Sequence, residues 1–423
     1  MNSTSDAPEP QDEGAQRAQA QSSETAQASQ AAQSSQTTKP ARMVSLDVFR
    51  GLTIAGMILV NDPGTWGAIY WPLDHAEWNG WTPTDLIFPF FLFIVGVSMT
   101  LSFAARLRRG VTRTALARHI VIRSVLILVV AYFLSLFPTF HFATMRFPGV
   151  LPRIAVCYLL AGLFVLITAR RKFSKDGEDA GFTVNIPAVA SALAALLIGY
   201  WALMRFVPVP GFGVGNLTPE GNLAAWIDRR VLYGHMWSQL KQVRDPEGIL
   251  STLPAIGTVL SGVLVGEWLR SSREQTRKIA GLIGVGAAAM IAGRLLHYVF
   301  PINKNLWTST YVIFTSGFAM IALAACMWIV DVKSWKKWAW PFLVFGSNAI
   351  TAFFIATELA ILSTRYHVHS GGRAITWHGY VYTHFFANLA APKNASLIFA
   401  IFFVLLCFLP MWLLYRKRIF IKL

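Results

Sequence analysis

The sequence predicts an all-α polytopic membrane protein with about ten transmembrane helices and both termini in the cytoplasm. Hydrophobic residues make up 54% of its 423 residues and charged residues only 14%, whereas a typical soluble domain has roughly 25% charged residues. Apolar runs of about 20 residues, the length that crosses a bilayer, recur along the chain. Basic residues are also distributed unevenly between the loops expected on the two sides of the membrane.

Each apolar run predicts one spanning helix. The first run is the weakest, because Asp47 and Arg50 interrupt its start. The expected spans are 46–62, 84–105, 117–137, 152–169, 185–207, 249–269, 277–299, 308–331, 340–363 and 395–415.

Lysine and arginine residues predict the orientation. With the N-terminus in the cytoplasm, the inner segments carry 22 basic residues and the outer segments carry ten. Four of these ten lie in one long loop, over which the positive-inside rule is weak. A missed or additional helix would move every later loop to the other side of the membrane and mix the basic residues of the two sides. The observed bias therefore supports ten helices. It also accounts for the net charge of +16 without a nucleic-acid partner.

Residues 1–42 are rich in Gln, Ser and Ala and contain no apolar run. This composition predicts a disordered cytoplasmic tail in front of a transmembrane domain at 43–423. Cys157, Cys326 and Cys407 all lie inside apolar runs, without the spacing of a disulfide framework or a zinc site. We interpret them as packing residues and expect no metal.

The stretch LDHAEWNGWTPTDLIFPFFLF at 73–93 brings four titratable residues to the start of an apolar helix. They are Asp74, His75, Glu77 and Asp85. Thr82-Pro83-Thr84 is a favourable helix start, and the helix dipole favours a carboxylate in the first turn, which explains Asp85 alone. Histidine takes and returns a proton near neutral pH. His75 is therefore the sharpest candidate in this outer loop, although a lone histidine in a loop more often has no catalytic role.

Other polar residues lie inside predicted spans, where ionisable groups usually face a cavity or a partner. Asp47 and Arg50 share a helix face, which fits either a structural ion pair or a ligand path entered from the cytoplasm. Asn61 follows Asp47 by 14 residues, roughly 21 Å along a helix, and either caps that helix or serves the reaction. Glu358 lies deep in the ninth span and is expected to have a partner or to face water.

Asp245 and Glu247 open the sixth span, in the run DPEGILSTLPAIGTVLSG. Pro254 is expected inside that helix, together with Gly257 and Gly262. Small residues and a proline kink indicate either a close approach between helices or a locally opened backbone that lines a cavity.

The most specific signal in the chain is a series of long motifs in one order. They are SLDVFRGLTIAGMILVN, HAEWNGWTPTDLIFPFFLFIVGVSM, PGVLPRIAVCYLL, DPEGILSTLPAIGTVLSG, INKNLWTSTYVIFTSGFAM and WPFLVFGSNAI. Together they resemble the heparan-α-glucosaminide N-acetyltransferase family and its bacterial relatives, from about residue 43 to 363.

This resemblance implies transfer of an acetyl group from cytosolic acetyl-CoA, across a membrane, to the amino group of glucosamine or a terminal glucosaminide. It places the catalytic residues at His75, Asn61 and Asp85. Substrate or cofactor binding is expected from Asp47, Arg50 and Arg153, which match family motifs, and from Asp245, Glu247 and Glu358. The resemblance also implies a homodimer, and we expect it in a bacterial inner membrane.

Two mechanisms fit these residues. In the first, His75 takes a proton from the attacking amine as general base, Asp85 orients the imidazole, and Asn61 donates a hydrogen bond to the oxyanion. In the second, His75 itself carries the acetyl group. The sequence leaves both open.

Two other classes of function remain. An O-acyltransferase for a cell-envelope glycan would use the same histidine and asparagine. An amino-sugar transporter fits ten helices with buried charges, although the chain shows no internal repeat of the kind that many transporters have.

Overall fold

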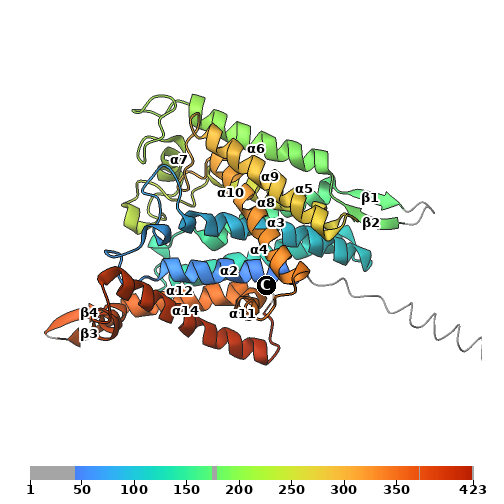
Figure 1. Ribbon diagram of the computed structural model, residues 1–423. Helices are drawn as coiled ribbons and strands as arrows, with labels where there is room; N and C mark the ends of the chain where they lie inside the picture. The colour runs from blue at the N-terminus through green and yellow to red at the C-terminus, as the bar shows by residue number, and fades with distance from the viewer. Residues whose placement is uncertain (1–42, 174–178, 371, 422–423) are drawn as a thin grey trace, which may run out of the picture. The chain divides into compact units, whose positions relative to one another are not determined.

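The computed structural model describes residues 43–173, 179–370 and 372–421, and the tail expected at 1–42 lies outside them. The described residues are mostly helical (Figure 1). The longer helices are α2 (Val44–Asn61), α3 (Ile87–Arg108), α4 (Arg113–Leu136), α5 (Val150–Thr168), α6 (Ile186–Phe206), α8 (Thr252–Arg270), α9 (Gln275–Leu296), α10 (Ser309–Cys326), α11 (Trp340–Ser347), α12 (Ala349–Arg365) and α14 (Pro392–Arg416).

Shorter elements connect these helices. Two antiparallel hairpins, β1 with β2 and β3 with β4, project from opposite ends of the helices (Figure 1). The short elements are η1 (Trp71–Leu73), η2 (Pro83–Leu86), η3 (Phe142–Thr144), β1 (Arg170–Phe173), β2 (Asp179–Thr183), α7 (Leu223–Val231), η4 (Ser238–Leu240), η5 (Met327–Val332), β3 (His367–Ser370), β4 (Arg373–Thr376), α13 (Trp377–Val381) and η6 (Tyr382–Phe386).

The protein is a multi-pass membrane protein, as the sequence predicts. Within the described residues, nine helices are long and apolar enough to cross a membrane. The helices α11 and α12 pass the same test only together, and they are bent by 86° relative to one another. Ten spans result if this bent pair counts as one.

The prediction of one continuous helix at 340–363 is wrong, because the helix breaks at Asn348. The backbone of Asn348 leaves the helical region, with φ −133° and ψ 47°. Its buried side chain donates to the carbonyl of Ile419 at 3.0 Å and accepts from the amide of Ile421 at 2.8 Å. Asn348 therefore ties the break to the C-terminal segment after α14.

The helices α3 and α8 pack closely against one another. Gly96 and Gly262 face the partner backbone so closely that a Cβ atom on either would overlap a carbonyl oxygen, that of Val259 or of Phe93. Pro254 is the third residue of α8, where its missing N–H costs no helical hydrogen bond. The proline kink expected there is therefore wrong, and close helix packing explains the glycines.

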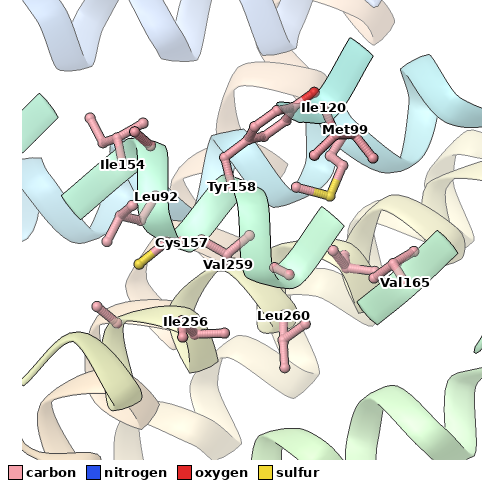
Figure 2. Close-up of a cluster of buried hydrophobic side chains, with 14 of the residues drawn as sticks. Leu92, Met99, Ile120, Ile154, Cys157, Tyr158, Val165, Ile256, Val259 and Leu260 are labelled. Atoms are coloured by element: carbon pink, nitrogen blue, oxygen red, sulfur yellow. The ribbon is translucent and has the colours of Figure 1, made fainter. Parts of the chain in front are cut away.

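The largest cluster of buried side chains lies where α3, α4, α5 and α8 meet (Figure 2). It contains Leu92, Ile120, Tyr158 and Val259, together with Cys157. Helix association inside a bilayer depends on such van der Waals packing, because lipid tails are as apolar as leucine. All three cysteines are buried and free, which confirms that they are packing residues.

The start of α2 packs against α11 through glycines on both helices. A Cβ atom on Gly51 would overlap the carbonyl of Phe342, and one on Gly346 would overlap the carbonyl of Asp47. Asp47 forms an ion pair with Arg50 at 3.0 Å, so the structural ion pair predicted from the sequence is present. Below, the two ends of the bundle are named after α2 as the Val44 end and the Asn61 end.

The contact between α3 and α8 predicts a sharp sensitivity to one added methyl group. Gly262→Ala should lower the Tm of the purified protein by several degrees, because overpacking in a close contact costs roughly 1–3 kcal/mol or more. Gly284→Ala in α9 is the matched control, since its Cβ would meet no atom within 4 Å. Thermal unfolding in detergent measures both variants, and equal Tm values would contradict this account.

Candidate active site

The loop after α2 leads to a tight helix start that fixes Asp85. The backbone amide of Thr82 donates to Asp85 Oδ2 at 3.0 Å, and the Thr82 hydroxyl contacts the same oxygen at 3.2 Å. This capping box begins η2, which continues into α3. The helix start predicted at Thr82-Pro83-Thr84 is confirmed. It turns the Asp85 carboxylate back toward the preceding loop.

Asp85 holds His75 by its imidazole. Asp85 Oδ1 lies 2.8 Å from His75 Nδ1, and Asp85 Oδ2 accepts the backbone amide of Ala76 at 3.1 Å. The Asp85 side chain is 1% exposed, whereas that of His75 is 42% exposed. An ionised carboxylate only accepts hydrogen bonds, so Nδ1 carries the proton in this pair. His75 Nε2 then carries the lone pair of the ring.

Lys304 completes this cluster, and the sequence analysis did not single it out. Its Nζ lies 3.0 Å from His75 Nδ1, 3.2 Å from His75 Nε2 and 3.5 Å from Asp85 Oδ1. Nearly equal distances to both ring nitrogens place the ammonium against the imidazole rather than along one lone pair. Burial lowers the pKa of Lys304, and the carboxylates of Asp85 and Glu247 oppose that shift.

Lys304 could have been noticed because it lies in the stretch INKNLWTSTYVIFTSGFAM, which the resemblance already marked. Its position 229 residues after His75 gives no local indication that the two side chains meet. The contact depends on the tertiary fold.

The cluster lines a cavity of about 610 Å³. Apolar side chains of α2, α3, α5 and α12 form its inner part, and it reaches Thr53 on α2. Of the predicted residues, Asn61, His75, Asp85 and Glu247 line it. The remaining polar and charged residues of its wall are Asp74, Glu77, Thr84, Arg146, Arg244, Lys304 and Asn305.

Asn61 ends α2, and the cap position after it is Asp62. Among the described residues, the side chain of Asn61 has no hydrogen-bond partner. Its amide therefore lines the cavity with its donors free, which helix capping does not explain.

A second ion cluster supports the wall around Glu247. Arg146 binds both oxygens of Asp245, at 2.9 and 2.6 Å, and one oxygen of Glu247 at 2.6 Å. Burial works against the charge of Arg146, but the two carboxylates hold its pKa above the usual value. Asp245 also accepts the backbone amides of Trp237 and Glu247. Asp245 is thus a buried support, and Glu247 is the member that reaches the cavity.

Arg153 lies behind this wall rather than in the cavity. Its Nη2 donates to the carbonyl of Gly248 at 3.2 Å and to the hydroxyl of Ser251, and its guanidinium stacks on Trp307. The side chain is almost fully buried, with only 2% of Arg153 exposed. The structure therefore does not place Arg153 where it could touch a ligand in this cavity.

Three other predicted binding residues also lie away from the cavity. Asp47 and Arg50 pair near the Val44 end, where Arg50 also donates to Ser98 at 2.8 Å. The carboxylate oxygens of Glu358 are buried and have no hydrogen-bond partner within the described part of the chain. A side-chain or backbone partner for Glu358 is therefore not found there.

Comparison with known proteins agrees with this geometry. Residues 42–174 match the family described as heparan-alpha-glucosaminide N-acetyltransferase, catalytic. The resemblance to this family is therefore confirmed over these residues. It is 31% identical over 354 residues to heparan-alpha-glucosaminide N-acetyltransferase of Homo sapiens, and 32% identical over 361 residues to that of Mus musculus. Each alignment covers 74% of this chain, but only 52% and 53% of the two relatives. The chain thus spans about half the length of the curated relatives it matches.

The segment matched to the acetyltransferase family contains Asn61, His75 and Asp85. Lys304 and Glu247 lie after that segment, so the later helices complete the wall of the same cavity.

A buried carboxyl behind the loop of Glu247 predicts a pH-dependent stability. Asp228 accepts the amide of Ile249 at 3.0 Å, and burial raises its pKa to about 6. The folded state therefore holds this proton more tightly than the unfolded state, whose pKa is near 4. The resulting stabilisation is complete below about pH 4 and is lost as the pH rises to about 6.

Asp228→Asn should remove this dependence and keep an acceptor oxygen in place. We expect the Tm of the wild type, relative to that of D228N, to fall by a few degrees between pH 4 and pH 7. Thermal unfolding across this range measures the difference, and parallel curves would contradict the shifted pKa.

Proposed function

We propose that the protein is a membrane acetyltransferase that moves the acetyl group of acetyl-CoA to the amino group of glucosamine or a terminal glucosaminide. The observation that carries this proposal is the imidazole of His75, held by Asp85 in the wall of a 610 Å³ cavity. Both residues lie in the segment that matches the catalytic family. The acceptor class is taken from the name of the relatives.

The proton transfer follows from the tautomer of His75. Asp85 accepts a hydrogen bond from Nδ1–H, so Nε2 is the basic nitrogen of the ring. Nε2 takes a proton from the attacking amine as the amine nitrogen bonds to the thioester carbonyl carbon. The carbon–sulfur bond then breaks, and the proton on Nε2 passes to the leaving sulfur. Such general-base assistance is worth roughly 10²–10⁴ in rate.

Two other groups of the cavity wall fit the charge that develops. The amide of Asn61 has free donors for the oxyanion, and loss of one such donor typically costs about 10²–10³ in rate. The ammonium of Lys304 balances the carboxylate of Asp85 beside the ring. The same groups also fit a two-step reaction in which His75 carries the acetyl group. Mass spectrometry of the protein with acetyl-CoA and no acceptor distinguishes the two.

The proposed topology places the donor and the acceptor on different sides. On α2 the cavity wall extends from Asn61 to Thr53, about 12 Å along the helix. Both termini then lie in the cytoplasm of a bacterial cell with the protein in its inner membrane, and the Asn61 end faces outward. Acetyl-CoA approaches from the Val44 end, where the basic residues gather, and the amino sugar from the Asn61 end.

His75→Ala should abolish the release of CoA that depends on glucosamine, because no other described histidine lines the cavity. The measurement is an acetyl-transfer assay with the purified protein, acetyl-CoA and glucosamine. His369→Ala, which removes an exposed histidine outside the cavity, is the matched control and should keep wild-type turnover. Activity that survives His75→Ala would overturn the assignment of the base.

Asn61→Ala should lower kcat by about 10²–10³ with a smaller change in KM, because an oxyanion donor acts mainly in the transition state. Asn394→Ala, which removes an exposed amide outside the cavity, should leave both constants unchanged. A variant N61A with raised KM and wild-type kcat would instead assign Asn61 to substrate binding. A panel of amine and hydroxyl acceptors in the same assay separates N-acetylation from O-acetylation.

A further inference from the structure

Three basic side chains line the cavity, and two of them are neutralised by carboxylates. Arg146 binds Asp245 and Glu247 in direct ion pairs. Lys304 lies 3.5 Å from Asp85. The third, Arg244, forms no ion pair and no hydrogen bond with any residue that the structure describes.

The surroundings of Arg244 leave part of its guanidinium buried without a hydrogen-bond partner in the described part of the chain. Its Nε is buried and has no hydrogen-bond partner among the described residues, and its guanidinium lies over the ring of Trp78 with Cζ 4.6 Å from the centroid. A ring face attracts the cation but satisfies none of its five N–H donors. Burial lowers the pKa of Arg244, and only the more distant carboxylate of Glu220 opposes that shift.

Arg244 is nevertheless held in place from both sides. The next residue, Asp245, is buried and anchored by Arg146 and by the amide of Trp237. The Trp78 indole donates to the carbonyl of Leu217 at 2.9 Å, which fixes the ring under the guanidinium. A rigid, unpaired guanidinium in a cavity wall is preorganised for a ligand, because its planar fork matches the oxygens of carboxylate, sulfate or phosphate groups.

We propose that Arg244 is a binding subsite for an anionic group, a carboxylate, sulfate or phosphate, on the ligand that occupies this cavity. The carboxylates of Asp74 and Glu77 flank His75 in the chain and line the same cavity. They attract an ammonium and repel an anion. An acceptor that carries both groups is thereby oriented with its amine at His75 and its acidic substituent at Arg244. This inference extends the proposed function, and the anion belongs either to the acceptor or to the phosphates of the donor.

Ligand binding without turnover tests the subsite independently of the proposed reaction. Glucosamine 6-phosphate and inorganic phosphate should each raise the Tm of the wild type, and Arg244→Gln should remove most of that increase. Arg230→Gln is the matched control, because Arg230 also stacks on a tryptophan, Trp226, but is exposed and lies outside the cavity. Equal increases in R244Q and R230Q would overturn the proposal.

Turnover identifies the source of the anion. If it is on the acceptor, the wild type should prefer glucosamine 6-phosphate to glucosamine in kcat/KM by about tenfold or more, since a hydrogen bond to a charged group is worth that much. R244Q should lose this preference, R230Q should keep it, and Arg244→Lys should restore part of it. If R244Q instead raises the KM for acetyl-CoA and leaves the acceptor ratio unchanged, the subsite holds a donor phosphate.

Failure of the subsite and failure of the reaction are distinguishable. A folded R244Q protein that keeps the acceptor ratio, the KM for acetyl-CoA and the phosphate-dependent increase in Tm would overturn the subsite and leave the acetyltransferase intact. A wild type that shows the phosphate-dependent increase but acetylates no acceptor would support the subsite and contradict the proposed reaction.

Discussion

The buried carboxylate of Asp85 is the group on which the candidate site depends. One oxygen holds the imidazole of His75, and the other accepts Ala76 and Thr82. A buried acceptor that loses its donors costs roughly 1–3 kcal/mol, and more when it is charged. The same three donors therefore start α3, fold the preceding loop back and select the ring tautomer. The hydroxyl of Tyr311 binds the backbone carbonyl of Asp85 and ties α10 to this point.

A second set of buried charges supports another part of the cavity wall. Removal of one partner of a buried ion pair typically costs 3–5 kcal/mol, because the other charge stays behind. Arg146 is shared by Asp245 and Glu247, so each member of that cluster depends on the other two. Arg153 supports the same loop from behind through Gly248 and Ser251. These two polar clusters thus form parts of the cavity wall, and apolar side chains line the space between them.

The features that could be predicted from the sequence are those that depend on one short segment of the chain. Hydropathy located the spans, because a bilayer imposes a length on each apolar run. The pair of His75 and Asp85 could be predicted because a capping box and a short loop join two residues only ten positions apart. The break at Asn348 could not be predicted in this way, because its hydrogen-bond partners belong to a segment more than 70 residues later.

Side-chain direction was the second property that the sequence did not reveal. Arg153 and Glu247 both belong to recognisable motifs, yet only Glu247 faces the cavity. A helix shows which residues share a face, but neighbouring helices decide which face lines a cavity. Lys304 and Arg244 illustrate the same point, because each is a basic residue of a loop and nothing in the local sequence indicates what it contacts. The fold brings Lys304 to His75 and Arg244 to Trp78.

The polar residues at the two ends of α2 have different physical roles. At the Asn61 end, the cavity is lined by an amide that has no hydrogen-bond partner among the described residues. At the Val44 end, Asp47 and Arg50 satisfy one another, and the glycine contacts of α2 with α11 leave no room for a side chain between the backbones. The cavity wall on α2 reaches only as far as Thr53. Under the proposed topology, acetyl-CoA approaches from the Val44 end and meets this close contact of α2 with α11, which lies next to the break at Asn348. The residues at this end of α2 therefore close the bundle, whereas those at the Asn61 end line the cavity.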